Sequence, residues 1–311
     1  MQTPDPLVLA LDGSTRVCSA ALLRPTAGCE TGWEVMSRRA KADGRGQARA
    51  LLGLVDEMLE QVSGMPRDLA AVVVGTGPGT FTGVRITVAT ARALSLALSV
   101  PVLGVSTLAA LAAGSAGAQP GCRGGATPMA EVTAWLRGAS TMMPVVDARR
   151  GQVFYGLYEK PAGGGSRHHA WVRRGAYGVC DRGSLALVLQ AHGARDTVIL
   201  AERQGLLDEV PSGARVIEAD VYAEHLVIGQ DALEEPGVMP LGKSLGPWLR
   251  VGLARSIFER GAATAVGEST EGLGVGAVGS PESVTPIYVR SPDADLHIQK
   301  MKDPWADDNA T

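Results

Sequence analysis

The sequence predicts an α/β protein made of two similar lobes that face each other across a cleft. Short apolar strands alternate with helices through the first half of the chain, which is typical of a layered α/β unit. A strand, an acidic turn and a returning strand then occur twice, over residues 8–23 and again over residues 143–158. Asp12 lies at the first turn and Asp147 at the second, so we interpret the pattern as an internal duplication. With 311 residues, 45% of them hydrophobic, the chain can bury the cores of two domains.

The first lobe is expected to span residues 1–113. Its strands are short apolar runs bounded by turn residues, and its first helix carries apolar residues at helical spacing. The order of these elements predicts a sheet with mixed strand directions. The expected strands are 7–11, 17–23, 33–37, 69–74 and 100–105, and the expected helices are 47–62, 84–99 and 107–113.

The rest of the chain divides by composition. Residues 114–142 are rich in Gly and Ala and are expected to connect the lobes. The second lobe is expected over residues 143–260, and its last helix, 247–260, could pack on the first lobe. Residues 261–311 comprise a low-complexity segment, a strand-like run at 285–290 and a polar tail.

The stretch from residue 69 to residue 99 organises the first lobe. An apolar strand leads into the glycine-rich turn 75–83, and a helix whose only charges are Arg85 and Arg92 follows. The turn lacks the spacing of a Walker A or a GxGxxG loop, so it is either a tight structural turn or a phosphate cradle. A helix that is apolar on nearly every side is buried in its own core or against a partner.

Composition and charge exclude several functions. The net charge of -3 gives no basic field for independent binding of nucleic acid. The four cysteines form no CxxC pair, which fits a reducing cytosol, and the N-terminal residues do not resemble a signal peptide. The uncharged run 93–118 is broken by Ser, Pro and Gly, so a membrane span is not expected. We therefore expect a cytoplasmic protein with no membrane contact.

Histidine usage argues against a metal centre. The first half of the chain contains none, and no HxxxH or HExxH pattern occurs anywhere among the five histidines. No Gly-x-Ser-x-Gly nucleophile elbow is present either. The sequence thus predicts no metal site, no catalytic triad and no catalytic residues.

The two acidic turns have a functional and a structural interpretation. Asp12 could hold a hydrated Mg²⁺ beside a phosphate, with the amides of Gly13 and Ser14 nearby, or it could only cap its turn. For Asp147 the structural interpretation is favoured, because Arg149 would pair with its carboxylate, as would the adjacent arginine. Basic runs at 38–49 and 167–174 are either solvated faces or contacts to a tRNA backbone.

Six segments, taken in order, resemble the bacterial TsaB (YeaZ) family. They are LALDGSTRVCSAALL, QARALLGLVDEML, VVVGTGPGTFTGVRITVATARALS, VPVLGVSTL, MPVVDARRGQVFYGLYE and PIYVR. The resemblance covers residues 7–158 well, apart from 114–140, and the C-terminal half thinly. It implies two ribonuclease-H-like lobes of the actin-like ATPase (ASKHA) type. The sequence departs from the family's pattern in three ways. Gln47 stands where a histidine is common, and the first turn reads Asp-Gly-Ser-Thr where Asp-Thr-Ser-Thr is usual. The Gly/Ala-rich insertions at 114–140 and 261–283 are extra.

The resemblance also implies a role in making threonylcarbamoyladenosine beside the anticodon of tRNA. In that family the chain is a non-catalytic partner that TsaD requires, the ATPase TsaE completes the complex, and tRNA is contacted through the complex. Family members form homodimers when alone, through the helices that correspond here to 47–62 and 84–99. The implied interface residues are Leu51, Leu52, Val55, Met58, Leu59, Arg85, Val88, Ala89 and Arg92.

A nucleotide is not required by this interpretation, although weak binding of ATP or ADP with Mg is conceivable. The candidate residues are Asp12, Gly13, Ser14, Thr15, Gly77, Gly79 and Thr80. The alternative function is an ATPase or phosphotransferase of the actin-like superfamily that uses Asp12 and Asp147. A metallo-glycoprotease, the third interpretation, is opposed by the missing histidines.

Overall fold

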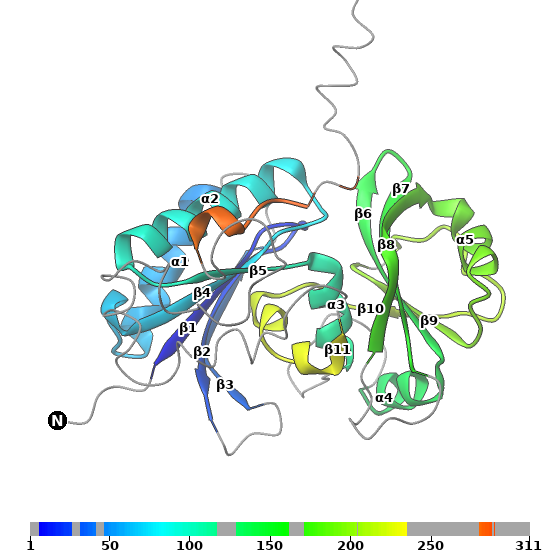
Figure 1. The fold of residues 1–311 in the computed structure, drawn as a ribbon, viewed down its shortest axis with the longest axis horizontal. Coiled ribbons are helices and arrows are strands. Elements are labelled where there is room, and N and C mark those ends of the chain that lie inside the picture. The colour runs from blue at the N-terminus through cyan, green and yellow to red at the C-terminus, as the bar shows by residue number, and fades with distance from the viewer. Residues whose placement is uncertain are drawn as a thin grey trace, which may run out of the picture.

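The computed structural model has two α/β lobes packed side by side around a central helix (Figure 1). Together they form five layers, in the order helices, sheet, central helix, sheet, helix. The structure describes residues 6–26, 32–41, 47–116, 129–161, 171–203, 205–234, 280–287 and 289.

The first lobe contains a five-stranded sheet in the order β3-β2-β1-β4-β5. The first three strands are antiparallel neighbours, and β4 and β5 join them in parallel, as the mixed strand directions in the sequence predict. The strands are β1 (Leu7–Asp12), β2 (Cys18–Pro25), β3 (Trp33–Lys41), β4 (Leu69–Gly75) and β5 (Val102–Val105).

Helices cover both faces of this sheet. Along β1, Leu9 and Leu11 point to one face and Val8 and Ala10 to the other, because successive strand side chains alternate. The leucines pack against α1 (Gln47–Gln61) and α2 (Phe81–Leu98), which lie on the outer face. The opposite face packs against α3 (Thr107–Ala116). A short 3-10 turn, η1 (Pro66–Asp68), leads into β4.

The second lobe repeats this topology and confirms the predicted duplication. Its sheet runs β10-β9-β6-β7-β8-β11, so β8-β7-β6-β9-β10 matches β3-β2-β1-β4-β5 strand for strand. The elements are α4 (Met129–Gly138), β6 (Thr141–Arg149), β7 (Gln152–Glu159), β8 (Trp171–Asp181), η2 (Arg182–Ser184), α5 (Leu185–Ala191), β9 (Thr197–Ala201), β10 (Arg215–Glu218), η3 (Ala223–Leu226), η4 (Gln230–Ala232) and β11 (Leu233–Glu234).

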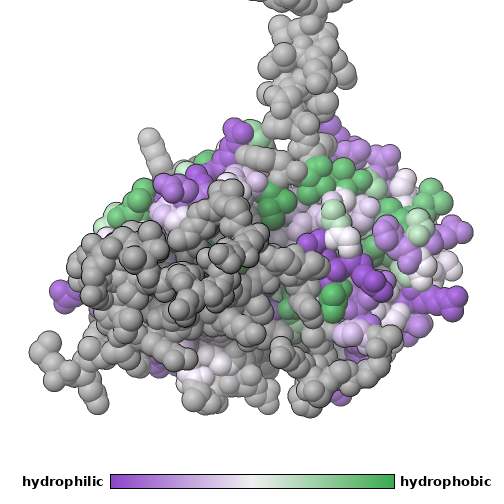
Figure 2. Space-filling model, viewed as in Figure 1, coloured by the Kyte–Doolittle hydropathy of each residue, from purple (hydrophilic) through white to green (hydrophobic). Residues whose placement is uncertain are grey.

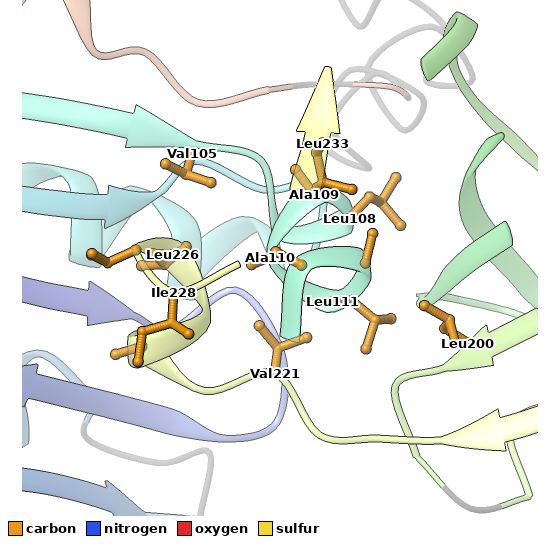
Figure 3. Packing of buried hydrophobic residues seen from close by; sticks show 14 of the residues in the cluster. Val105, Leu108, Ala109, Ala110, Leu111, Leu200, Val221, Leu226, Ile228 and Leu233 are labelled. Carbon is orange, nitrogen blue, oxygen red and sulfur yellow. The ribbon is translucent and has the colours of Figure 1, made fainter. Parts of the chain in front are cut away.

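One apolar core joins the two lobes through α3. Every residue of this helix from Thr107 to Ser115 is buried. Figure 3 shows its leucines and alanines between Leu200 of the second sheet and the apolar side chains of the η3 region, including Leu226 and Ile228. The lobes are therefore in direct apolar contact around α3.

Two expectations about the chain's organisation need correction. The predicted connection 114–142 contains α4, whose Val132 and Leu136 belong to the core between the lobes. The predicted strand at 285–290 is not one in the described part of that range, where the chain forms η5 (Pro281–Ser283) and an extended run. The predicted helix 247–260 and the segment 261–279 lie outside the described residues.

Candidate functional site

The glycine-rich loop between β4 and α2 joins three distant segments of the chain. Thr80 donates its backbone N–H to the carbonyl of Ser14, 2.7 Å away, in the β1–β2 turn. Thr107, at the start of α3, donates to the carbonyl of Gly77 at 2.8 Å. Ile287 donates to the carbonyl of Thr76 at 2.7 Å. We call residues 75–80 and these partners the glycine junction.

Two of its glycines are explained by atoms of the first turn that lie against them. A Cβ atom at Gly79 would lie 2.1 Å from the carbonyl oxygen of Ser14, and one at Gly75 would lie 1.9 Å from Oδ1 of Asp12. Both distances are far below any real contact, so a larger residue at either position would push the β1–β2 turn away. The glycines are needed here for packing, whatever the loop binds.

Asp12 lies under this junction and is fully buried. Its carboxylate accepts hydrogen bonds from the hydroxyl of Ser14 at 2.8 and 3.0 Å and from the backbone N–H of Ser14 at 3.3 Å. Thr107 in turn donates its hydroxyl to that of Ser14 at 2.8 Å. Burial raises the pKa of Asp12 to about 7, against the lowering effect of these hydrogen bonds, and Glu202 adds a smaller upward contribution.

The predicted nucleotide-binding residues are thus brought together, but their polar groups face inward. Asp12, Gly13, Ser14 and Thr15 are all buried, and Asp12 is covered by Gly75. This geometry favours the structural interpretation of the loop, and nucleotide contact at Gly77, Gly79 and Thr80 stays a prediction. Among the described residues, no group of three or more His, Cys, Asp or Glu is placed to hold a metal ion.

The structure corrects the centre of the predicted partner surface. Five of the implied residues lie in the core of the first lobe, because α1 and α2 turn their main apolar faces toward the sheet. These five are Leu51, Val55, Met58, Leu59 and Val88. Leu52, Arg85 and Ala89 do face outward, and Arg92 is half-buried and donates to the carbonyl of Glu282 at 3.3 Å.

The outward face of α2 carries small and apolar side chains, of which the sequence interpretation named Ala89 but missed Phe81, Ala93 and Leu96. Ala89 and Ala93 are exposed in one row with Arg85, and Leu96 is 64% exposed at the end of that row. The guanidinium of Arg85 lies 3.7 Å above the ring of Phe81, which is itself exposed. The spacing of three to four residues was a signal that could have identified this row. We call Phe81, Arg85, Ala89, Ala93 and Leu96 the α2 surface.

By length and composition α2 could also cross a membrane. In the structure, however, its buried residues, among them Val84, Val88 and Ala91, pack on the sheet, while the charged Arg85 lies on the opposite face. The core helix of a folded domain passes the same test of length and hydropathy, and α2 packs one of its faces on the sheet as such a helix does.

The second lobe gathers arginines around its own acidic turn. Asp147 contacts Arg182 at 3.1 Å, Arg203 at 3.3 Å and Arg149 at 3.7 Å. Burial alone would raise the pKa of Asp147, but the backbone N–H of Arg149 and the guanidiniums of Arg203 and Arg182 outweigh it and hold the pKa below its ordinary value. The predicted pairing with Arg149 is confirmed.

Arg182 and Arg203 were missed because no sequence spacing connects them to Asp147. They follow β8 and β9, and the carboxyl ends of β6, β8 and β9 meet at one edge of the sheet. Beside them Glu202 accepts a hydrogen bond from the backbone N–H of Asp147 at 3.0 Å. Burial raises the pKa of Glu202 to about 7.

The basic run at 38–49 also has intramolecular partners in its described part. Arg38 pairs with the buried Glu224 of η3 at 2.8 Å, and Arg39 donates to Gln61 at 2.8 Å. These contacts favour a structural role for Arg38, which ties the first sheet to the segment that follows β10. The run 167–174 lies partly outside the described residues.

Comparison with known proteins gives consistent matches. The family model "TsaD: tRNA N6-adenosine threonylcarbamoyltransferase" matches residues 43–165. The tRNA threonylcarbamoyladenosine biosynthesis protein TsaB of Escherichia coli is 29% identical over 160 residues, which are 50% of this chain and 57% of that protein. TsaB of Bacillus subtilis is 30% identical over 152 residues, covering 49% of this chain and 55% of that protein. The chain spans about half the length of the curated relatives it matches.

A solved structure extends the likeness to nearly the whole chain. It is a Pseudomonas aeruginosa protein described as similar to peptidase YEAZ, and it superposes with a TM-score of 0.54 at 25% identity, covering 92% of this chain and 100% of that chain. Together with the duplicated sheets, this match confirms the predicted fold of two similar α/β lobes. These matches support the TsaB (YeaZ) family for this chain.

Proposed function

We propose that this chain is a non-catalytic scaffold in tRNA threonylcarbamoyladenosine biosynthesis, and that it works as the cytoplasmic partner of TsaD in a complex completed by TsaE. The similarity to TsaB proteins of two bacteria supports a place in this biosynthetic pathway. The observation that carries the scaffold role is the α2 surface, an exposed row of small and apolar side chains on a rigid helix.

The α2 surface has the features of a helix-pairing face. The alanines at 89 and 93 let another backbone approach closely, and Leu96 and Phe81 supply exposed apolar area at the two ends of the row. Leu52, 49% exposed on the neighbouring α1, extends the apolar area. A second copy of the chain would pair with itself through this face about a two-fold axis, and TsaD would replace that copy in the complex. A stable interface would bury on the order of 1,600 Å².

The test is reconstitution of tRNA threonylcarbamoylation with TsaD and TsaE, with and without this chain. Ala93→Glu adds a charge to the centre of the α2 surface, so we expect loss of homodimer, loss of co-purification with TsaD and at least a tenfold drop in modified tRNA. The matched control is Leu187→Glu, which places the same charge at a 64% exposed position on α5.

Two results would contradict the proposal in different ways. If modification proceeds equally well without the chain, the scaffold function is wrong. If Ala93→Glu behaves like Leu187→Glu, the function can stand but the interface lies elsewhere. Glutamate at Val55 or Val88 would not serve as a test, because those side chains are buried and the charge would unfold the lobe.

The alternative function, an ATPase or phosphotransferase of the actin-like class, receives less support from the geometry. Its candidate ligand, Asp12, would have to move out from beneath Gly75 to reach Mg-ATP. Calorimetry with Mg-ATP distinguishes the two functions. Micromolar binding that disappears in Asp12→Ala would favour the alternative.

A further inference from the structure

We propose that the β6–β7 turn and the arginines behind it form a surface that binds the phosphate groups of an RNA backbone. The inference deepens the proposed function and rests on it, because it gives a chain in a tRNA-modifying complex its own contact with tRNA. The surface consists of Arg149, Arg150, Arg182 and Arg203, and we call it the arginine cluster.

The cluster holds more hydrogen-bond donors than its acidic groups can use. One carboxylate, Asp147, receives three guanidiniums, each of which carries five N–H donors, whereas a carboxylate offers about four acceptor positions. Two other carboxylates lie nearby. Glu202 is buried and accepts the backbone N–H of Asp147, and Asp181 accepts from Gln152 at 3.2 Å. The guanidinium donors around Asp147 therefore outnumber the acceptor positions of its carboxylate.

One of these donors has no acceptor in the part of the chain that the structure describes. Nε of Arg182 is buried and has no hydrogen-bond partner among the described residues. Leaving a buried charged donor without an acceptor is costly, and native structures retain such groups mainly where a ligand or water supplies the acceptor. A phosphate oxygen has the charge and geometry to bond a guanidinium in this way.

The backbone conformation of the β6–β7 turn also supports a role for its charges. Arg149 and Arg150 both have positive φ, 64° and 54°, ahead of Gly151 at 76°. Asn, Asp and Gly are the usual residues in such turns, because the left-handed conformation is unfavourable for a long side chain. Two arginines here weaken the turn and place two cations at an exposed tip, which indicates that their charge, not the turn, is what the position requires.

The two halves of the duplication differ at this point. In the first lobe the matching turn contains Gly13 and Ser14, which are buried under the glycine junction. In the second lobe the turn is exposed and basic, and the side chain of Arg149 is 63% exposed. The turn lies at the upper edge of the second lobe in Figure 1, and hydrophilic residues gather along that edge in Figure 2.

The place of the cluster also suits a ligand. Its arginines follow the carboxyl ends of β6, β8 and β9, which is the edge where open α/β sheets bind their ligands. The chain as a whole carries a net charge of -3, so the cluster is a local patch rather than part of a basic field. An exposed tip with two arginines, backed by the guanidiniums that hold Asp147, matches a polymer of phosphates. We expect it to add affinity within the complex instead of binding RNA tightly by itself.

The experiment measures the affinity of a tRNA transcript for the complete reconstituted complex over a range of salt concentrations. It compares the wild-type chain with Arg149→Ala/Arg150→Ala. We expect the double variant to bind roughly tenfold more weakly and to lower the slope of log affinity against log salt by about 2, one for each lost phosphate contact. Arg149→Lys/Arg150→Lys keeps both charges but lacks the planar guanidinium. Its affinity for tRNA should lie between those of the wild type and the alanine double variant.

The control is Arg67→Ala, which removes an exposed arginine from η1 in the first lobe, outside both basic runs. If the double variant has the same affinity and salt slope as this control, the proposed RNA contact is wrong. If it loses binding of ATP while binding of tRNA is unchanged, the cluster serves a nucleotide and the proposal is also wrong. Neither result would affect the requirement for the chain in modification, which tests the proposed function separately.

Discussion

Asp12 shows how strongly the fold changes the chemistry of a single residue. The sequence places a carboxylate at a strand end, where a magnesium-bound phosphate is a reasonable expectation. In the structure it is fully buried, its nearest polar partner is Ser14, and its pKa is raised to about 7. A carboxyl group in this position is closer to a hydrogen-bonded element of the core than to a cation ligand.

The raised pKa of Asp12 predicts how stability depends on pH. The folded state binds a proton that the unfolded chain releases near pH 4, so this group stabilises the fold at low pH and the contribution is lost as pH rises toward 7. Because the pKa of Asp12 is raised by about three pH units, the free energy of unfolding would lose up to about 4 kcal/mol of this contribution. Urea unfolding measures the free energy of unfolding at pH 5 and at pH 8. Between these two values it should fall less for Asp12→Asn than for the wild type. Equal declines would mean that Asp12 is ionised in the fold.

At the scale of elements, the glycine junction allows β4 and α2 to pack closely against the β1–β2 turn. Gly79→Ala should destabilise the protein by roughly 2 kcal/mol or more, because its Cβ would overlap the carbonyl of Ser14. Gly53→Ala is the matched control. It lies on the exposed side of α1 with no atom within 4 Å of a new Cβ, and we expect a gain of about 0.5 to 1 kcal/mol. Thermal or denaturant unfolding measures both, and a neutral Gly79→Ala would contradict the packing role.

The sequence predicted most elements of the first lobe because each has its own local signal. The apolar run of β4 and the spacing of α1 are examples, and the repeated acidic turn indicated the second lobe. What could not be predicted depends on contacts between distant segments. An almost uncharged α2 does not reveal which face it turns inward, so Val88 was assigned to a partner when it belongs to the core. Arg182 and Arg203 approach Asp147 only through the order of the strands.

At the scale of the whole molecule, the C-terminal segment is part of the first lobe. Val284 is buried among residues of α1, α2 and the first sheet, and Ile287 bonds to the glycine junction. Val284→Asp should therefore lower the free energy of unfolding by about 3 kcal/mol, since it buries an unpaired charge. Thr285→Asp, at an exposed neighbouring position, is the control and should change stability by less than about 0.5 kcal/mol. Equal stability of the two variants would show that the segment does not hold the lobe together.

The return of the C-terminal segment to the first lobe has a consequence for synthesis on the ribosome. Domains generally fold in the order in which they leave the exit tunnel. Here the strands and helices of the first lobe emerge early, yet Val284 and Ile287 reach it only after the second lobe has been made. Until then the glycine junction lacks one of its three partners and α2 lacks the contact with Glu282. The nascent first lobe thus stays incomplete while the second lobe is being translated, and its core closes only once the chain has passed residue 287.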